Sequence, residues 1–279
     1  MPAATSPLLR FKRLLLTGAA GALGRELRTR LAPHCVHLRL SDIADLGAAQ
    51  ANEETMQAAL EDRAAVDALL AGVSAVVHLG GISVEGPFEP ILQANIVGLY
   101  HLYEAARRHG VPRIVFASSN HVTGFYRQDE VIDATMPVRP DGNYGLSKAW
   151  GENLSRFYFD RYGIETVCLR IGSCFPEPKD RRMLATWLSY DDLERLVVAS
   201  LTAPVVGHSI VYGMSDNRAA WWDNTPARHL GYAPQDSSEP YRAGVCARQP
   251  TLAMHDRARL YQGGDFVTQG PYPEGDETP

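Results

Sequence analysis

The sequence predicts an α/β protein built on a doubly wound parallel sheet. Short apolar runs typical of strands alternate with amphipathic helical patterns, and a glycine-rich turn follows the first of these runs. Strands separated by helices pair in parallel through right-handed crossovers, so helices cover both faces of the sheet. Because ligands of such sheets bind at the carboxyl ends of the strands, we expect function in the loops that follow them.

The elements can be placed in order along the chain. The strand candidates are leucine-rich or β-branched runs at 13–17, 36–40, 75–79, 113–117, 166–171 and 209–212. Helical patterns, with apolar residues at i, i+3 or i+4, cover 23–31, 63–70, 91–109 and 144–162. Prolines punctuate the chain after about Gly172 and the alternation dissolves there. We predict one domain over 1–279, with a core at 12–172 and mainly a substrate-binding cap, with one or two late strands, at 173–279.

Composition excludes several classes of function. A chain of 279 residues with 45% hydrophobic side chains buries roughly 75% of its unfolded surface, so it needs no disulfide or structural metal. Its 27 Lys and Arg against 32 Asp and Glu give a net charge of −5 without a long basic run, which argues against nucleic acid as a partner. The four cysteines form no CxxC pair and lack zinc-like spacing, so we expect reduced thiols and no metal.

The chain also lacks the segments that would direct it to a membrane. Its longest uncharged apolar stretch, 196–206, is far below the 18 or so residues that a membrane span requires. The start, Met1 to Arg13, carries three cations but no apolar segment typical of a signal peptide. We therefore expect a cytoplasmic protein with a short disordered leader.

The turn after the first strand candidate predicts a dinucleotide site. Gly18, Gly21 and Gly24 have GxxGxxG spacing and open a helix, so the backbone can approach a pyrophosphate whose charge meets the helix N-terminus. A plain strand-to-helix turn would contain the same glycines. Asp42, about 20 residues further on, adds a carboxylate for the ribose hydroxyls. It favours NAD over NADP because it repels a 2′-phosphate; if Asp42 only caps the next segment, that choice stays open.

Two further strand ends contribute to the same edge. The third strand candidate ends in His78-Leu79-Gly80-Gly81, which places glycines beside the riboses of a dinucleotide. We interpret His78 as structural. The fourth ends in Ser118-Ser119, and Ser119 can orient a substrate oxygen.

Tyr144 and Lys148 form a candidate catalytic pair on the longest helical pattern. Their i, i+4 spacing places them on one helix face. A phenol that acts as a base near pH 7 needs about 4 kcal/mol of phenolate stabilisation, which a neighbouring ammonium and a positive nicotinamide ring can supply. Lys148 can also donate to the nicotinamide ribose. A solvated helix start would show the same YxxxK pattern, but the nearby serine hydroxyls favour chemistry.

Together with Asn95, these residues resemble the extended short-chain dehydrogenase/reductase superfamily across nearly the whole chain. Within it, the uronate dehydrogenase family is similar to this chain at 78–85, 116–121, 170–174, 182–184 and 262–266. The resemblance implies that 12–172 is a Rossmann NAD-binding core. It also implies oxidation by NAD of the C1 hydroxyl of cyclic glucuronate or galacturonate, which yields an aldarolactone, and a homo-oligomer.

The resemblance assigns residues by position. It makes Tyr144 the catalytic base, with Ser119 as its hydroxyl partner and Lys148 as the cation that lowers its pKa. The residues implied to bind NAD are Gly18, Ala20, Gly21, Ala22, Leu23, Gly24, Asp42, Leu60, Leu79, Gly80, Gly81, Tyr144 and Lys148. Those implied to bind the uronate are Ser83, Ser119, Asn120, His121, Tyr144, Ser173, Arg182, as the clamp for the C6 carboxylate, and Phe266, which closes the pocket. Ala59 replaces the usual Asp beside Leu60, which we expect to affect cofactor affinity rather than chemistry.

Several alternatives remain open from the residues alone. Arg181 and Arg182 are adjacent, and without the resemblance either can serve as the clamp. Asn95 either holds a water in a proton relay or bonds a nearby backbone carbonyl. A sugar-nucleotide epimerase or dehydratase that retains NAD shares the same motifs, although only about 107 residues follow Gly172. A regulator that binds NAD without chemistry typically loses the tyrosine or the lysine, and this chain keeps both.

Overall fold

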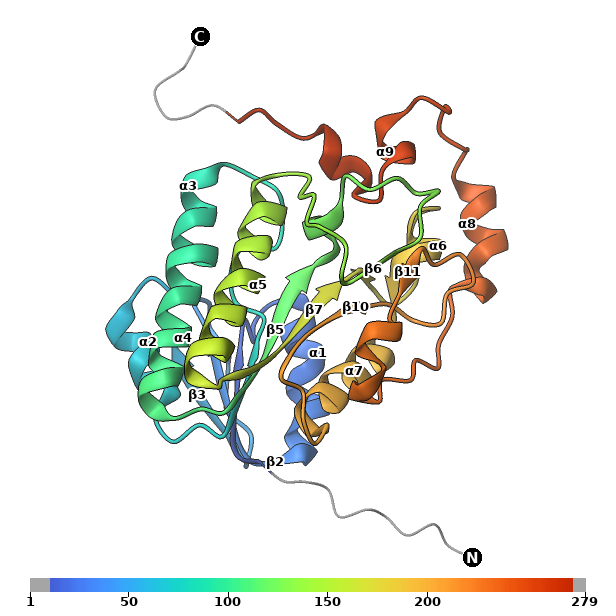
Figure 1. Ribbon diagram of the computed structural model, residues 1–279. Coiled ribbons are helices and arrows are strands. Elements are labelled where there is room, and N and C mark those ends of the chain that lie inside the picture. The colour runs from blue at the N-terminus through green and yellow to red at the C-terminus, as the bar shows by residue number, and fades with distance from the viewer. Residues whose placement is uncertain (1–10, 273–279) are drawn as a thin grey trace, which may run out of the picture.

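The computed structural model describes residues 11–272, which form a seven-stranded sheet between two layers of helices (Figure 1). The strand order is β3-β2-β1-β4-β5-β7-β10, and every pairing is parallel. The strands are β1 (Phe11–Thr17), β2 (Cys35–Asp42), β3 (Glu53–Gln57), β4 (Ala75–His78), β5 (Arg113–Ser119), β7 (Glu165–Ile171) and β10 (His208–Gly213). The order reverses between β1 and β4, where such sheets bind ligands. The predicted doubly wound parallel sheet is confirmed.

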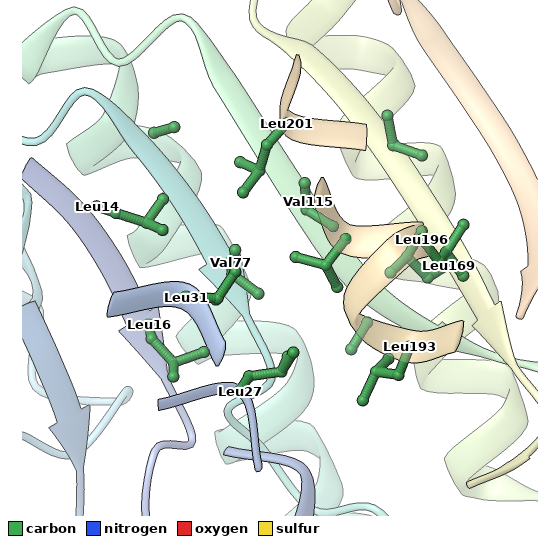
Figure 2. Packing of buried hydrophobic residues seen from close by; sticks show 14 of the residues in the cluster. Leu14, Leu16, Leu27, Leu31, Val77, Val115, Leu169, Leu193, Leu196 and Leu201 are labelled. Atoms are coloured by element: carbon green, nitrogen blue, oxygen red, sulfur yellow. The ribbon is translucent and has the colours of Figure 1, made fainter. Parts of the chain in front are cut away.

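Two sets of helices bury the two faces of the sheet. One face packs against α2 (Arg63–Leu70), α4 (Gly98–His109) and α5 (Asn143–Tyr162), and the other against α1 (Ala22–Leu31) and α7 (Tyr190–Thr202) (Figure 1). Figure 2 shows leucines of α1 and α7 packed over apolar side chains of β1, β4, β5 and β7. Burial on both faces explains why these strands are continuously apolar.

Strand β3 and helix α7 are absent from the elements that the sequence predicts. The β3 segment Glu53–Gln57 is polar because it forms the sheet edge, where Glu53 pairs with Arg28 at 2.6 Å. The segment of α7 was expected to be irregular. Its first turn is capped by the Ser189 hydroxyl, which accepts from the Asp192 amide at 2.9 Å, and its leucines are buried in the core.

The helix expected over 91–109 is present and contains a π-helical turn. It comprises α3 (Phe88–Ile91), a π-helical turn η2 (Leu92–Val97) and α4. The Asn95 side chain lies within the π turn and binds the backbone of Ile82, with Ile82 N donating to Oδ1 at 2.8 Å and Nδ2 donating to Ile82 O at 3.0 Å. A π turn of this kind redirects a side chain, and it is frequent at functional sites.

Short elements lie over the carboxyl ends of β5 and β7 (Figure 1). Two small parallel ladders pair β6 (Ile132–Asp133) with β11 (Trp222–Asp223), and β8 (Ser173–Cys174) with β9 (Trp187–Leu188). The helices here are α6 (Met183–Thr186), α8 (Arg242–Arg248) and α9 (Arg257–Leu260), and the 3-10 turns are η3 (Asn120–Thr123), η5 (Glu239–Tyr241) and η6 (Gly264–Thr268). Two 3-10 turns lie elsewhere: η1 (Ala32–His34) joins α1 to β2, and η4 (Thr225–Leu230) contacts the start of β10.

Two expectations from the sequence concern membrane-spanning segments and the start of the chain. Within residues 11–272, no helix has the length and apolar character needed to cross a membrane. The expected disordered leader lies almost wholly outside the described residues.

Candidate active site

The turn between β1 and α1 has the close packing that a pyrophosphate cradle requires. Gly18 has a φ of +69°, and a Cβ there would lie 2.7 Å from the carbonyl carbon of Leu79. A Cβ at Gly24 would lie 2.1 Å from the oxygen of Gly18. No side chain caps the start of α1 at Gly21, so the amide groups of its first turn, from Ala22 and Leu23 onward, can meet an anion. The turn therefore fits the phosphates of a dinucleotide.

Asp42 lies beside this turn at the end of β2. Its Oδ2 accepts from the Ala20 amide at 2.9 Å, and Oδ1 accepts from the Ala44 amide at 3.0 Å. The carboxylate therefore organises both loops, as the capping alternative expects. A carboxylate has about four lone-pair sites, so Asp42 retains acceptors for ribose hydroxyls.

The end of β4 forms the next part of the same edge. A Cβ at Gly80 would lie 3.0 Å from Leu60 Cδ1, and the Gly80 amide donates to Thr17 Oγ1 at 3.2 Å. Leu60 thus lies beside Gly80. Gly81 lies beside Asn95, because a Cβ at Gly81 would be 2.5 Å from Asn95 Oδ1. His78 is buried, its Nδ1 lies 2.7 Å from Thr17 Oγ1, and burial together with the charge of Lys148 lowers its pKa to about 3. It is a neutral packing residue.

Tyr144 and Lys148 lie side by side on the first turns of α5, and both are buried. Lys148 Nζ donates to the Ala117 carbonyl at 2.8 Å and lies 5.7 Å from the centre of the Tyr144 ring. Burial lowers the pKa of Lys148 to about 8. Burial also raises the pKa of Tyr144 to about 12, although a hydrogen bond with Ser119 acts in the opposite direction. Burial thus opposes the lowering of the phenol pKa that is expected from Lys148, and that lowering stays a prediction.

Glu85 holds the start of the helix that carries Tyr144. Its Oε1 accepts from the Asn143 amide at 2.9 Å, and its Oε2 accepts from the Tyr144 amide at 2.8 Å. These amides have no partner within the helix, and an anion at a helix N-terminus is favourable. The carboxylate also connects the loop of Ser83 to α5; Ser83 itself is exposed there.

Removal of this cap is expected to destabilise the protein. The change Glu85→Ala leaves two helix N-terminal amides without their acceptor, and we expect the free energy of unfolding to fall by about 1 to 2 kcal/mol. Urea denaturation followed by circular dichroism measures the change. Glu89→Ala, at an exposed position that bonds only Gln93, is the matched control. Equal stability of the two variants would contradict the capping role.

A second group of predicted residues gathers at the end of β5. Ser119 Oγ accepts from the His121 amide at 3.2 Å. The His121 ring stacks on Phe266 with centroids 3.9 Å apart, and its centroid lies 5.9 Å from that of Tyr144. His121 Nδ1 lies 2.7 Å from Asp141 Oδ2. The carboxy-terminal segment of the chain thus closes over the start of α5.

Arg182 reaches the same place from the start of α6. Its Nε donates to the Gln262 carbonyl at 2.6 Å, and its Nη1 donates to Ser173 Oγ at 3.3 Å. The Asn120 amide is oriented from its partners; Asn120 then accepts from Arg182 Nη2 at 2.7 Å and donates to Ile171 O at 3.0 Å. Burial lowers the pKa of Arg182. No carboxylate among residues 11–272 forms an ion pair with this guanidinium.

The neighbouring arginine has a different role. Arg181 Nε donates to the Gln249 carbonyl at 2.8 Å, and Nη2 donates to the Cys246 carbonyl at 3.0 Å, so its guanidinium holds the end of α8. Gly264 makes room for the other arginine: its φ is +63°, and a Cβ there would lie 2.6 Å from Arg182 Cδ. Arg182 alone of the pair lies with the other candidate substrate residues.

Three residues of this region have contacts that the sequence does not predict. Asp141 binds His121, and Glu85 binds the amides at the start of α5. Gln262 accepts from Trp222 Nε1 at 2.8 Å and fixes the backbone that Arg182 binds. Asp141 lies two residues before α5 begins, and no sequence motif indicates that it binds a histidine. Asn95 donates to Ile82 O and to Ser147 Oγ, both at 3.0 Å, which favours the structural alternative for that residue.

The arrangement combines three chemical capacities at one edge of the sheet. A glycine turn and an uncapped helix can hold a dinucleotide. A phenol beside a serine hydroxyl can accept a proton from an alcohol. A guanidinium with two N–H groups left over can bind a carboxylate by charge-assisted hydrogen bonds.

Comparison with known proteins supports this interpretation. The model of the NAD dependent epimerase/dehydratase family matches residues 14–202. A uronate dehydrogenase from Pseudomonas syringae pv. tomato is 60% identical over 263 residues, which cover 94% of this chain and 95% of that protein. The structure of a mutant uronate dehydrogenase from Agrobacterium tumefaciens complexed with NAD has a TM-score of 0.92 at 53% identity, covering 94% of this chain and 99% of that one.

A structure of glucuronic acid dehydrogenase from Chromohalobacter salexigens has a TM-score of 0.92 at 51% identity, covering 93% of this chain and 98% of that one. Each of these similarities covers more than nine tenths of the chain. The chain therefore belongs to the NAD dependent epimerase/dehydratase family and, within it, to the uronate dehydrogenases.

Proposed function

We propose that the protein oxidises the C1 hydroxyl of a cyclic hexuronate, glucuronate or galacturonate, to the aldarolactone with NAD. The observation that carries this proposal is the Arg182 guanidinium, which lies partly buried beside Asn120 and Ser173 and has no carboxylate partner among the described residues. Asp141, Asp180 and Asp265 attract this charge only from beyond ion-pair distance, and a buried charge without a directly bound counter-ion is unfavourable. A substrate carboxylate supplies that counter-charge, and the relatives named above act on uronates.

The residues of this chain divide the reaction among them. Arg182 binds the C6 carboxylate, and Ser119 holds the C1 oxygen while Tyr144 accepts its proton. Lys148 positions the nicotinamide ribose, and Asp42 the adenosine ribose. When bound, NAD would supply the hydride acceptor for C1 and a positive ring that favours the phenolate. The Phe266 ring covers His121 and so reduces the access of water to the pocket.

The surroundings of Tyr144 lead to a pH prediction. Because burial raises its pKa, the phenol is protonated in the free protein at neutral pH, and the base form becomes more abundant as pH rises. We expect kcat/KM for the uronate to rise tenfold per pH unit on the acidic limb, between about pH 5 and the pKa of the complex with NAD. Initial rates of NADH formation at constant ionic strength measure this profile. A flat profile from about pH 5 to about pH 9 would contradict a titrating phenol.

We also propose that the protein is a cytoplasmic homo-oligomer that does not bind nucleic acid. Tyr100 on α4, and Leu146 and Phe157 on α5, expose 47%, 49% and 47% of their surfaces, and such side chains favour burial against a second copy. Cys168, Cys174 and Cys246 are free thiols, which agrees with a reducing compartment. Sedimentation equilibrium tests the oligomeric state.

The activity is tested by NADH formation with a substrate panel. Glucuronate and galacturonate are compared with glucose and galactose, which lack the carboxylate, and with UDP-glucose. We expect NADH to accumulate much faster with the uronates than with the neutral sugars. Conversion of UDP-glucose without net NADH would instead support an epimerase that retains its NAD.

A further inference from the structure

Asp141 is buried against the candidate substrate residues, yet the function described so far gives it no role. Asp141 as a whole exposes 6% of its surface, and its side chain is fully buried. The carboxylate is enclosed by backbone, because a Cβ at Gly124 or at Gly263 would overlap Oδ2 at 1.8 Å and 1.9 Å. The other oxygen, Oδ1, has no hydrogen-bond partner within residues 11–272. Burying a carboxylate this way is costly, so a functional reason must be sought.

Among the residues that the structure describes, His121 is the one side chain to which Asp141 forms a hydrogen bond. Oδ2 lies 2.7 Å from Nδ1. The rest of His121 is also fixed: its amide donates to Ser119 Oγ, and its ring stacks on Phe266 at 3.9 Å, with the ring planes 14° apart. Such an imidazole has little freedom to rotate. In the described chain, Nε2 makes no hydrogen bond with another side chain.

The chemistry of this pair determines where the imidazole proton lies. An ionised carboxylate only accepts hydrogen bonds, so Nδ1 must donate to it. Burial lowers the pKa of His121, and the nearby Arg182 acts in the same direction although Asp141 opposes both. The ring is then neutral at pH 7 and carries its single proton on Nδ1. Nε2 is left with a lone pair.

We propose that Asp141 is a positioning residue that fixes the Nδ1–H tautomer of His121, so that Nε2 accepts a hydrogen bond from a ring hydroxyl of the uronate. This inference rests on the proposed function. It assigns two complementary sites to one substrate: Arg182 donates to the carboxylate, and His121 accepts from a hydroxyl. A neutral His121 beside Arg182 avoids placing a second cation there. The lone pair on Nε2 also repels a carboxylate, so the carboxylate end of the sugar lies at Arg182 and a hydroxyl lies at His121.

The tautomer can be observed directly in the protein without substrate. Two-bond ¹H–¹⁵N spectra of ¹⁵N-histidine-labelled protein at pH 7 distinguish protonated from bare ring nitrogens, and the signals missing from His121→Gln assign His121 among the nine histidines. We expect a protonated Nδ1 and a bare Nε2. A protonated Nε2, whether as the other tautomer or as an imidazolium, would overturn the proposal. In Asp141→Asn, whose amide can also donate, we expect the signals to shift towards the Nε2–H form.

Kinetics test whether the tautomer serves the substrate. Asp141→Asn is expected to lower kcat/KM for the uronate by about 10- to 100-fold, mainly through KM for the uronate. KM for NAD and the melting temperature are expected to stay close to those of the wild type. Asp160→Asn, at an exposed ion pair with Arg156 on the far end of α5, is the matched control. A purely structural role of Asp141 would instead lower the melting temperature and affect both KM values.

A double-mutant cycle completes the test. A Gln side chain at position 121 can present an acceptor without help from Asp141, so Asp141→Asn in the His121→Gln background is expected to change kcat/KM less than about twofold. Fully additive losses would overturn the coupling. An inactive wild-type protein that still shows the Nδ1–H tautomer would instead contradict the proposed function and the substrate contact, and leave the assignment of Asp141 to His121 intact.

Discussion

Replacement of Tyr144 by Phe is expected to lower kcat for uronate oxidation by about 100- to 10,000-fold, the range for loss of a positioned general base. The phenol oxygen is the only group of the ring that the reaction uses. The ring itself packs edge-on against His121 and Phe266, and Phe keeps this packing. Initial rates of NADH formation at saturating NAD and uronate measure the effect.

The same variant must retain the rest of the site if the loss is chemical. NAD affinity, measured by calorimetry, and the melting temperature are expected to change little. Tyr100→Phe, at an exposed position on α4, is the matched control and should keep full activity. A Tyr144→Phe protein with wild-type kcat would show that another group accepts the proton.

Replacement of Arg182 by Ala is expected to lower kcat/KM for uronates by about 2 to 4 kcal/mol of transition-state stabilisation. The guanidinium provides the only cation among the residues gathered beside Asn120 and Ser173, within the described part of the chain. Its loss removes the charge-assisted bonds to the C6 carboxylate. The kcat/KM values are measured for a uronate and for the corresponding neutral hexose.

The comparison of the two sugars separates recognition from folding. Arg182 also binds the Gln262 carbonyl. Its removal therefore loosens the carboxy-terminal segment, which lowers kcat/KM for every substrate. Only the loss of a carboxylate contact lowers the uronate rate more than the hexose rate. Arg182→Lys keeps the charge without the planar fork and should fall between the wild type and Arg182→Ala. Equal losses for uronate and hexose would contradict the clamp.

The fold was predictable wherever local sequence and burial agree. The strands of the sheet interior are apolar because helices cover both faces, and the glycine turn identifies the junction of β1 with α1. Strand β3 was not predicted because an edge strand needs no apolar face. Its glutamates instead form ion pairs with arginines. Helix α7 was not predicted because it lies in the proline-rich second half of the chain, where we expected irregular structure.

The site shows the same division between local and long-range information. The i, i+4 relation of Tyr144 and Lys148 is a property of one helix, so the sequence predicts their juxtaposition. The pKa of Tyr144 also depends on burial by distant segments, which raises it and which the helical spacing does not reveal. The pairing of Asp141 with His121 joins a loop and a strand end that no motif connects.

The proposed reaction moves hydride from C1 of a uronate to the nicotinamide, which leaves as NADH. Incubation of the wild-type protein with NAD and glucuronate deuterated at C1, followed by NMR of both products, follows this transfer. We expect one deuterium at C4 of the nicotinamide for each lactone formed. Deuterium that remains on the sugar, or returns to it without net NADH, would rule out this reaction.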